Sequence, residues 1–275
     1  MDVIVPKSLE ELLPYIDNEE KRIAAGCTDI IVALDAGKLK EKPLIDINRV
    51  EEIKTIYEKS GKVYIGANVP LSDIIKNDII KMNFPLLVKA IKTIGSPQIR
   101  NRATLGGNIA NASPSGDSIA ALTLLDAGVL LKGSYGEREV PLKYFIKGVG
   151  KTELRREEFI EYVTLEKKFA DYECYFEKVG LRTAMTISVC SMALLFKREQ
   201  GILSDIKIAF GAAAPKVMEI TKAEEFLKGK RIEKDVLMKA GDIIEKTVSP
   251  IDDIRASAAY RRKVCKNLIM RLLEI

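Results

Sequence analysis

Residues 95–117 hold most of the side chains whose types and spacing could bind a ligand. The segment reads Gly-Ser-Pro-Gln-Ile-Arg-Asn-Arg-Ala-Thr-Leu-Gly-Gly-Asn-Ile-Ala-Asn-Ala-Ser-Pro-Ser-Gly-Asp, and a helical pattern follows it. Small residues let backbone N–H groups approach a polar ligand, and hydroxyl and amide groups add donors around it. An anion suits such a site, with a nucleotide diphosphate as the leading candidate; a long surface loop between two helices is the alternative. Loops this long are uncommon in compact domains unless they are functional, which favours a ligand site.

A second candidate site is the turn Gly26-Cys27-Thr28-Asp29, between an expected strand at 21–25 and an expected helix at 30–36. Its amides and the start of the helix could hold phosphate oxygens. The turn has one glycine and is therefore not the GxGxxG fingerprint, so an ordinary strand–helix turn fits equally well. Arg100 and Arg102 could pair with phosphate or anchor the long segment by salt bridges. Lys178, on an expected strand, could reach an anion or point to solvent.

Composition favours a soluble globular protein of one large or two smaller domains. The chain has 275 residues, of which 47% are hydrophobic and 30% charged, a balance typical of proteins with a core. No apolar run approaches the length of a membrane span, and the first residues lack the features of a signal peptide. We therefore expect a cytoplasmic protein without a membrane partner. The net charge of +5 is spread among acidic residues, so a nucleic-acid partner is not expected.

The cysteine and histidine content narrows the chemistry. Four cysteines stand at positions 27, 174, 190 and 265, none within three residues of another. This spacing predicts neither a metal-binding pair nor a disulfide framework. The chain has no histidine, which excludes serine–histidine and cysteine–histidine nucleophilic sites. If the protein is an enzyme, we expect a bound cofactor to carry the chemistry.

The hydrophobic pattern predicts an α+β chain that divides near residue 168. In the first part it predicts a helix capped by Ser8, a second helix from Asp117 to Leu125 capped by Asp117, and a hairpin turned at 133–136. Further strands are expected at 43–48, 62–66 and 159–165, and further helices at 71–76 and 84–93, followed by an irregular loop over 95–116. Beyond residue 169 the pattern predicts strands at 175–179, 186–196 and 202–212, then helices at about 221–228, 233–246 and 252–273. Strands followed by helices indicate a separate α+β domain.

Three motifs, in this order, resemble the FAD-binding subunit of the molybdenum hydroxylases, the family of the xanthine, carbon monoxide and nicotinate dehydrogenases. Ala24-Ala25-Gly26-Cys27-Thr28-Asp29 is similar to the Ala-Gly-Gly-Thr-Asp turn of the family. The second motif runs from Ile99 to Ile109 and on through Ser113-Pro114-Ser115-Gly116-Asp117. The third is Phe176-Glu177-Lys178-Val179-Gly180-Leu181-Arg182. The resemblance covers essentially the whole chain.

The resemblance implies the architecture. Residues 1–168 would form a two-lobed FAD-binding domain of the vanillyl-alcohol-oxidase/PCMH type, with lobes at about 1–55 and 56–168. Residues 169–275 would form an α+β domain like that of the carbon monoxide dehydrogenase flavoprotein, with a three-stranded antiparallel sheet and helices. The flavin would lie extended between the two lobes.

The resemblance also implies which residues bind FAD, with none acting as a catalytic acid or base and none binding a metal. The backbone amides of the first motif would take the pyrophosphate: Ala24, Ala25, Gly26, Cys27, Thr28 and Asp29. A second wall would comprise Thr104, Gly106, Gly107, Asn108 and Asn111, where a Cβ on either glycine would hold the backbone away from the ligand. Gly116 would also belong to the cofactor-binding residues, and Asp117 would accept a hydrogen bond from a sugar hydroxyl. Ile94 stands where some relatives carry an aromatic residue, and Ile160 and Lys178 would lie near the adenine or the flavin ring.

The implied function is electron transfer. A molybdopterin-binding large subunit would oxidise the substrate, and [2Fe-2S] clusters on a small subunit would relay electrons to FAD, which would pass them to NAD+ or another acceptor. One alternative is a stand-alone flavin oxidoreductase of the vanillyl-alcohol-oxidase type, which would need a proton donor near the flavin. The other is a non-enzymatic module that binds a nucleotide.

Overall fold

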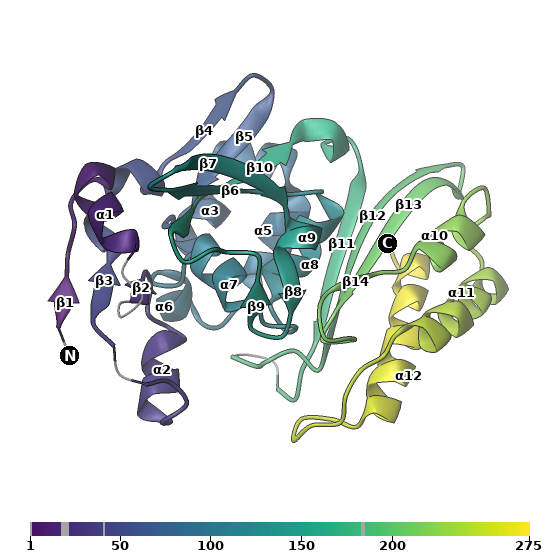
Figure 1. The fold of residues 1–275 in the computed structure, drawn as a ribbon. Coiled ribbons are helices and arrows are strands. Elements are labelled where there is room, and N and C mark those ends of the chain that lie inside the picture. The colour runs from purple at the N-terminus through teal and green to yellow at the C-terminus, as the bar shows by residue number, and fades with distance from the viewer. Residues whose placement is uncertain (1, 18–21, 41, 183–184) are drawn as a thin grey trace. The chain divides into compact units, whose positions relative to one another are not determined.

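The computed structural model describes residues 2–17, 22–40, 42–182 and 185–275, which form two compact units of interleaved segments (Figure 1). Unit 1 comprises Met1–Asn77, Ser96–Ala112 and Asp126–Lys167, and unit 2 comprises Asp78–Gly95, Ser113–Leu125 and Lys168–Ile275. Two segments from the first half of the chain thus belong with the C-terminal part. The division into two consecutive domains, 1–168 and 169–275, stays a prediction.

Unit 1 contains a small parallel sheet in the order β1-β3-β2, formed by β1 (Val3–Ile4), β3 (Leu44–Asp46) and β2 (Arg22–Ala24). The first residue of the expected strand at 21–25 lies outside the described residues. Helix α1 (Leu9–Ile16) begins as predicted at Ser8, whose Oγ accepts a hydrogen bond from the Glu11 amide. Helix α2 (Ile30–Asp35) follows β2. Leu12 and Ile16 of α1 pack into one cluster with Ile45 and Phe159.

The second sheet of unit 1 is antiparallel throughout, in the order β4-β5-β10-β6-β7. Its strands are β4 (Ile56–Lys59), β5 (Lys62–Gly66), β10 (Glu158–Glu166), β6 (Gly128–Gly133) and β7 (Gly136–Pro141). Val163 in the central strand faces Ile65 on one side and Val129 on the other, and all three are fully buried. The hairpin predicted with its turn at 133–136 is confirmed.

Short helices complete unit 1 and correct one expectation. They are η1 (Ile47–Arg49), η2 (Glu51–Lys54), α3 (Leu71–Lys76), α6 (Pro97–Arg100), α7 (Leu105–Asn111) and α9 (Leu142–Phe145); β8 (Ile146–Gly148) and β9 (Lys151–Thr152) form a further pair, and η3 (Lys167–Phe169) follows β10. The prediction of an irregular loop over 95–116 is wrong where α6 and α7 form. Ser96 and Thr104 cap these helices by accepting the amides of Ile99 and Gly107, and burial of Leu105 and Ile109 outweighs the low helix propensity of two glycines.

Unit 2 is built on an antiparallel sheet in the order β11-β12-β13-β14. The three long strands were predicted: β11 (Glu173–Val179), β12 (Cys190–Glu199) and β13 (Ile202–Gly211). The short β14 (Met218–Glu219) adds a fourth at the edge of β13. The helices are α4 (Asp78–Asn83), α5 (Pro85–Lys92), α8 (Asp117–Leu124), α10 (Thr221–Leu227), α11 (Lys234–Thr247), α12 (Ala258–Leu268) and η4 (Ile269–Leu273). No helix among the described residues is both long and apolar enough to cross a membrane.

Two elements of unit 2 begin well after their predicted starts. The helix expected from residue 252 begins at Ala258, because the carboxylate of Asp253 accepts the amides of Arg255 and Ala256 and closes a turn before it. The strand expected from residue 186 begins at Cys190. In both places side-chain hydrogen bonding or turn geometry replaces the regular pattern that hydrophobicity alone indicates.

The core of unit 2 contains two thiols in contact. Cys190 on β12 and Cys265 on α12 are both fully buried, and their Sγ atoms lie 3.2 Å apart. The contact with Cys265 and the burial together raise the pKa of Cys190 well above its usual value, so the Cys190 sulfur stays a poor nucleophile. We therefore expect iodoacetamide to modify the half-buried Cys27 and Cys174 in the native protein and to reach Cys190 and Cys265 only on unfolding. Peptide mass mapping checks this; rapid native labelling of Cys265 would contradict the packing.

Candidate functional site

The turn after β2 is held in an unusual backbone conformation. Cys27 has a φ of 61°, in the left-handed region that residues with a side chain rarely occupy. The Asn48 Nδ2 atom donates to the Ala25 carbonyl at 2.8 Å, and the Cys27 thiol donates to the same oxygen at 3.3 Å. These contacts fix the path of the chain between Ala24 and Asp29, where α2 begins.

The same turn presents backbone donors that the protein leaves unused. The amide N–H groups of Cys27, Thr28 and Asp29 have no acceptor within the described residues. Successive N–H groups around a residue of positive φ form a concave site for an anion. The turn can therefore bind phosphate oxygens through its backbone, whatever its side chains are.

Gly26 brings this turn against the second motif within unit 1. A Cβ on Gly26 would overlap the carbonyl oxygen of Arg102 and lie 2.9 Å from the Cα of Ala103. The glycine is thus required for backbone-to-backbone packing of the two segments. Turn 24–29 and the start of the segment that leads into α7 are neighbours, as the expectation of two walls of one site demands.

The two glycines of α7 have different roles. Gly106 is buried, its amide donates to the Ala67 carbonyl at 2.9 Å, and an added Cβ would meet the Ala67 Cβ at 2.6 Å. Gly106 is therefore needed for packing, which differs from the expected reason. Gly107 is exposed, and a Cβ there would meet only the Thr104 hydroxyl, at 3.0 Å. Asn108, half-buried, and Asn111, exposed, lie on the same helix.

In unit 2, two of the predicted residues form a buried ion pair. The Lys178 Nζ atom lies 2.6 Å from Asp117 Oδ2 and donates also to the Thr93 carbonyl at 3.0 Å. Their side chains are 8% and 3% exposed. The Ser188 hydroxyl donates to Asp117 Oδ1 at 2.5 Å. Burial raises the pKa of Asp117 above its ordinary value, although Lys178, Ser188 and Thr93 each lower it.

This ion pair changes how Asp117 and Lys178 are understood. The predicted helix cap is replaced: Gly116 precedes α8, and the Asp117 carboxylate turns inward to Lys178 and Ser188. Both carboxylate oxygens of Asp117 already accept hydrogen bonds from within the protein. The expected contact of Asp117 with a sugar hydroxyl of the cofactor stays a prediction. Lys178 has three ammonium hydrogens and two recorded acceptors, which leaves one donor for a ligand.

The remaining predicted residues lie in both units. Ile160 is buried on β10 of unit 1, beside an irregularity in its pairing with β6. Ile94, half-buried, follows α5 in unit 2. Gly116, also in unit 2, is buried, and a Cβ there would lie 2.7 Å from the Ile119 Cδ1 atom. A side chain at position 116 would therefore crowd Ile119 of α8.

Three residues of this arrangement were missed by sequence reasoning. Asn48 holds the turn, and Thr93 and Ser188 complete the surroundings of the ion pair. Asn48 lies in η1, two residues after β3 ends, a position where polar side chains often contact a neighbouring turn, and could have been considered on that ground. No local signal marks Ser188, which lies 71 residues from Asp117 in the sequence.

Comparison with known proteins identifies the family. Residues 1–166 match the FAD-binding domain in molybdopterin dehydrogenases, and residues 175–275 match the C-terminal domain of the carbon monoxide dehydrogenase flavoprotein. The chain belongs to the FAD-binding subunits of the molybdenum hydroxylases, so it is an oxidoreductase subunit whose cofactor is FAD. The resemblance and the fold class inferred from the three motifs are confirmed.

Individual relatives match this chain along nearly the whole length of both. The chain is 32% identical over 269 residues to the glyceraldehyde dehydrogenase medium chain of Sulfolobus acidocaldarius, covering 98% of this chain and 95% of that one. It is 28% identical over 278 residues to the nicotinate dehydrogenase FAD-subunit of Eubacterium barkeri, covering 98% and 94%. A solved carbon monoxide dehydrogenase from Hydrogenophaga pseudoflava, in a form that lacks the Mo-pyranopterin moiety, has a TM-score of 0.93 at 29% identity, covering 100% and 96%.

The residues of unit 1 fit a dinucleotide cofactor. The free amides at 27–29 suit a pyrophosphate, which offers several oxygens and needs donors rather than acceptors. Gly107 is exposed, so a ligand can approach its Cα, where an added side chain would stand in the way and crowd the Thr104 hydroxyl at 3.0 Å. Both observations concern the backbone, which explains why Cys27 in the middle of the turn is compatible with binding.

Proposed function

We propose that this chain transfers electrons within a multi-subunit molybdenum hydroxylase. It receives them from [2Fe-2S] clusters of a small partner subunit and passes them to NAD+ or another acceptor, while a molybdopterin-binding large subunit oxidises the substrate. The observation that carries the proposal is the match, over nearly the full length of both chains, to proteins named as medium chains or FAD-subunits of larger dehydrogenases. Such names belong to chains that work beside other subunits.

The proposed role of unit 1 is to bind the diphosphate of the cofactor. The amides of Cys27, Thr28 and Asp29 donate to its oxygens, and Gly107 allows the backbone of α7 to come close. Thr104, Asn108 and Asn111 add side-chain donors, although the Thr104 Oγ1 atom already accepts the Gly107 amide. FAD, when bound, supplies the one- and two-electron chemistry. The protein's part is to hold it and to keep one side open to the acceptor.

The proposed role of unit 2 rests on Lys178. Asp117 fixes the ammonium group by a 2.6 Å contact, and the Thr93 carbonyl fixes a second hydrogen. The third hydrogen then has a defined direction and is available to an acceptor atom of the cofactor. Asp117 thereby acts through Lys178, and Ser188 acts through Asp117. Gly116, Ile94 and Ile160 remain predicted lining residues on the strength of the family alone.

The proposal is tested by anaerobic bleaching of the flavin absorbance. The probes are glyceraldehyde, xanthine, nicotinate and carbon monoxide, which the names of the relatives provide. We expect one of them to bleach the flavin only when the chain is assembled with its partner subunits, and NAD+ or a dye acceptor to restore the colour. Bleaching of the chain without partners would indicate a stand-alone reductase, and no bleaching in the assembled complex would indicate a binding module.

A further inference from the structure

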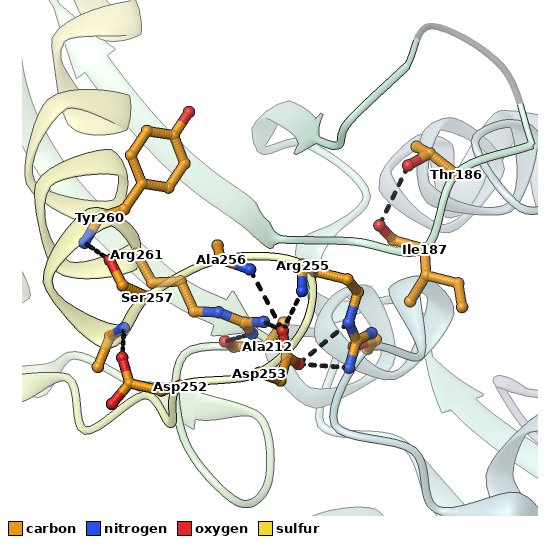
Figure 2. A network of polar contacts seen from close by, with 12 residues as sticks. Thr186, Ile187, Ala212, Asp252, Asp253, Arg255, Ala256, Ser257, Tyr260 and Arg261 are labelled. Carbon is orange, nitrogen blue, oxygen red and sulfur yellow. Dashed lines mark hydrogen bonds and ion pairs between the residues drawn. The ribbon is translucent and has the colours of Figure 1, made fainter.

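A network of charged side chains in the C-terminal part of unit 2 is centred on Asp253 (Figure 2). Its Oδ1 atom accepts the Arg255 amide at 2.8 Å, the Ala256 amide at 3.3 Å and Arg261 Nη2 at 2.6 Å. Its Oδ2 atom accepts Arg255 Nε at 3.0 Å and Nη2 at 2.6 Å. Although burial opposes it, the hydrogen bonds from Arg255 and Arg261 hold the pKa of Asp253 well below its usual range. The carboxylate is therefore ionised and saturated with donors at any working pH.

Both arginines extend the network to the segment that precedes α8. Arg255 Nη1 donates to the Ser115 hydroxyl at 3.4 Å. Arg261 Nη1 donates to the Ala212 carbonyl at 3.1 Å, and the Ala212 amide donates to the Pro114 carbonyl at 2.7 Å. Two separate routes therefore lead from the Asp253 carboxylate to Pro114 and Ser115. Arg255 and Ser115, which meet in one of these routes, lie 140 positions apart in the sequence.

Two features of this network are energetically unfavourable, which indicates that its geometry serves a function. Arg261 is 2% exposed, and its buried Nε–H has no acceptor among the residues that the structure describes. An unsatisfied donor of a buried guanidinium is unfavourable. Ala212 has a φ of 56°, a left-handed conformation that disfavours a residue with a Cβ. That conformation lets the Ala212 amide reach Pro114 while its carbonyl faces Arg261.

The segment so held leads directly into Gly116 and Asp117. Within it, the Gly116 amide donates to the Ser113 carbonyl at 3.0 Å, so a shift of Pro114 or Ser115 moves the start of α8. Asp117 in turn fixes Lys178. We propose that Asp253, Arg255 and Arg261 are positioning residues for the cofactor-binding segment 113–117, a proposal that rests on the assignment of Gly116 and Asp117 to the FAD site. Their side chains act on the cofactor only through that segment.

The test replaces Asp253 with asparagine, which keeps the size of the side chain and removes its charge. The matched control is Asp205→Asn: Asp205 lies on β13 of the same unit and accepts the Tyr172 hydroxyl at 2.6 Å, but has no recorded contact with the segment before α8. The full-length chain is stripped of FAD and titrated with FAD, and the dissociation constant is measured by flavin fluorescence. The melting temperature of the FAD-free protein and the visible circular dichroism of the bound flavin are recorded in parallel.

We expect Asp253→Asn to raise the FAD dissociation constant by about tenfold or more and to change the circular dichroism of the bound flavin. We expect Asp205→Asn to leave both unchanged, even where the two variants lower the melting temperature equally. Wild-type affinity and spectrum in Asp253→Asn, or an equal loss of affinity in Asp205→Asn, would overturn the proposal. A third variant, Asp117→Asn, tests separately whether the segment 113–117 belongs to the FAD site. Wild-type affinity and spectrum in that variant would overturn this assignment itself.

Discussion

The Gly107→Val variant should fold normally and lose nearly all of its FAD. Gly107 is exposed on α7, and the nearest atom that a Cβ would meet in the protein is the Thr104 hydroxyl at 3.0 Å. Valine is also a better helix former than glycine, which offsets the crowding of the Thr104 hydroxyl, so we expect the fold to be retained. Because the side chain fills the space that a ligand would use, we expect FAD binding to weaken at least tenfold, which is about 1.4 kcal/mol or more. FAD per chain and the melting temperature are the measurements.

Gly106→Ala is the matched control for this prediction. One residue away on the same helix, its Cβ would lie 2.6 Å from the Ala67 Cβ and 2.7 Å from the Ala67 carbonyl oxygen. Crowding of this kind costs about 1–3 kcal/mol of stability, so this variant should lose stability first and FAD as a consequence. Full FAD occupancy in Gly107→Val would contradict the assignment of α7 to the cofactor site.

The largest expected effect on stability follows from Lys178→Met. Methionine keeps the unbranched shape of the side chain, one atom shorter, but leaves the Asp117 carboxylate, 3% exposed, without its cation. Removing one partner of a buried ion pair typically costs about 3–5 kcal/mol. We expect a loss of this size in urea unfolding at pH 8, together with weaker FAD binding. The double variant Lys178→Met with Asp117→Asn should recover much of the stability but not the binding, since the donor to the cofactor is still missing.

The pH dependence of Lys178→Met follows from the direction of the Asp117 pKa. Burial raises that pKa, and Lys178 is the strongest of the groups that oppose the rise; without Lys178 the pKa rises further. The folded state then binds a proton more tightly than the unfolded state, so stability falls as pH increases from the unfolded value of about 3.9 to the raised folded value. The deficit of the variant should therefore shrink at pH 5 relative to pH 8. If Lys178→Met lost the same free energy of unfolding at pH 5 and at pH 8, the loss would not come from an unpaired Asp117 carboxylate.

The fold was predictable where local pattern and tertiary packing agree. Alternation over 129–140 predicted the hairpin of β6 and β7, and the long apolar runs predicted β12 and β13. Helix α7 was missed because its two glycines and two asparagines favour a loop, whereas its cap by Thr104 and the burial of Leu105 and Ile109 make it helical. Tertiary context overrides propensity there.

The site was predictable only in its local parts. Turn 24–29 is contiguous, so its residue types alone indicate what its backbone offers. The pairing of Lys178 with Asp117 joins residues 61 positions apart, and the Asp253 network joins residues 140 positions apart. Each of these side chains would be unremarkable on its own element, and only the fold gives it a partner. The family resemblance predicts Asp117 and Lys178 near the cofactor, but it gave no reason to expect them to bind each other.

The proposed role as the FAD subunit of a molybdenum hydroxylase is tested by the visible spectrum and metal content of the chain purified with its co-expressed partner subunits. The released chromophore is identified by chromatography, and molybdenum and iron are measured in the same preparation. We predict FAD at about one per chain, because the cofactor carries the chemistry of the subunit, together with both metals. An assembled complex that contains no flavin would contradict this role.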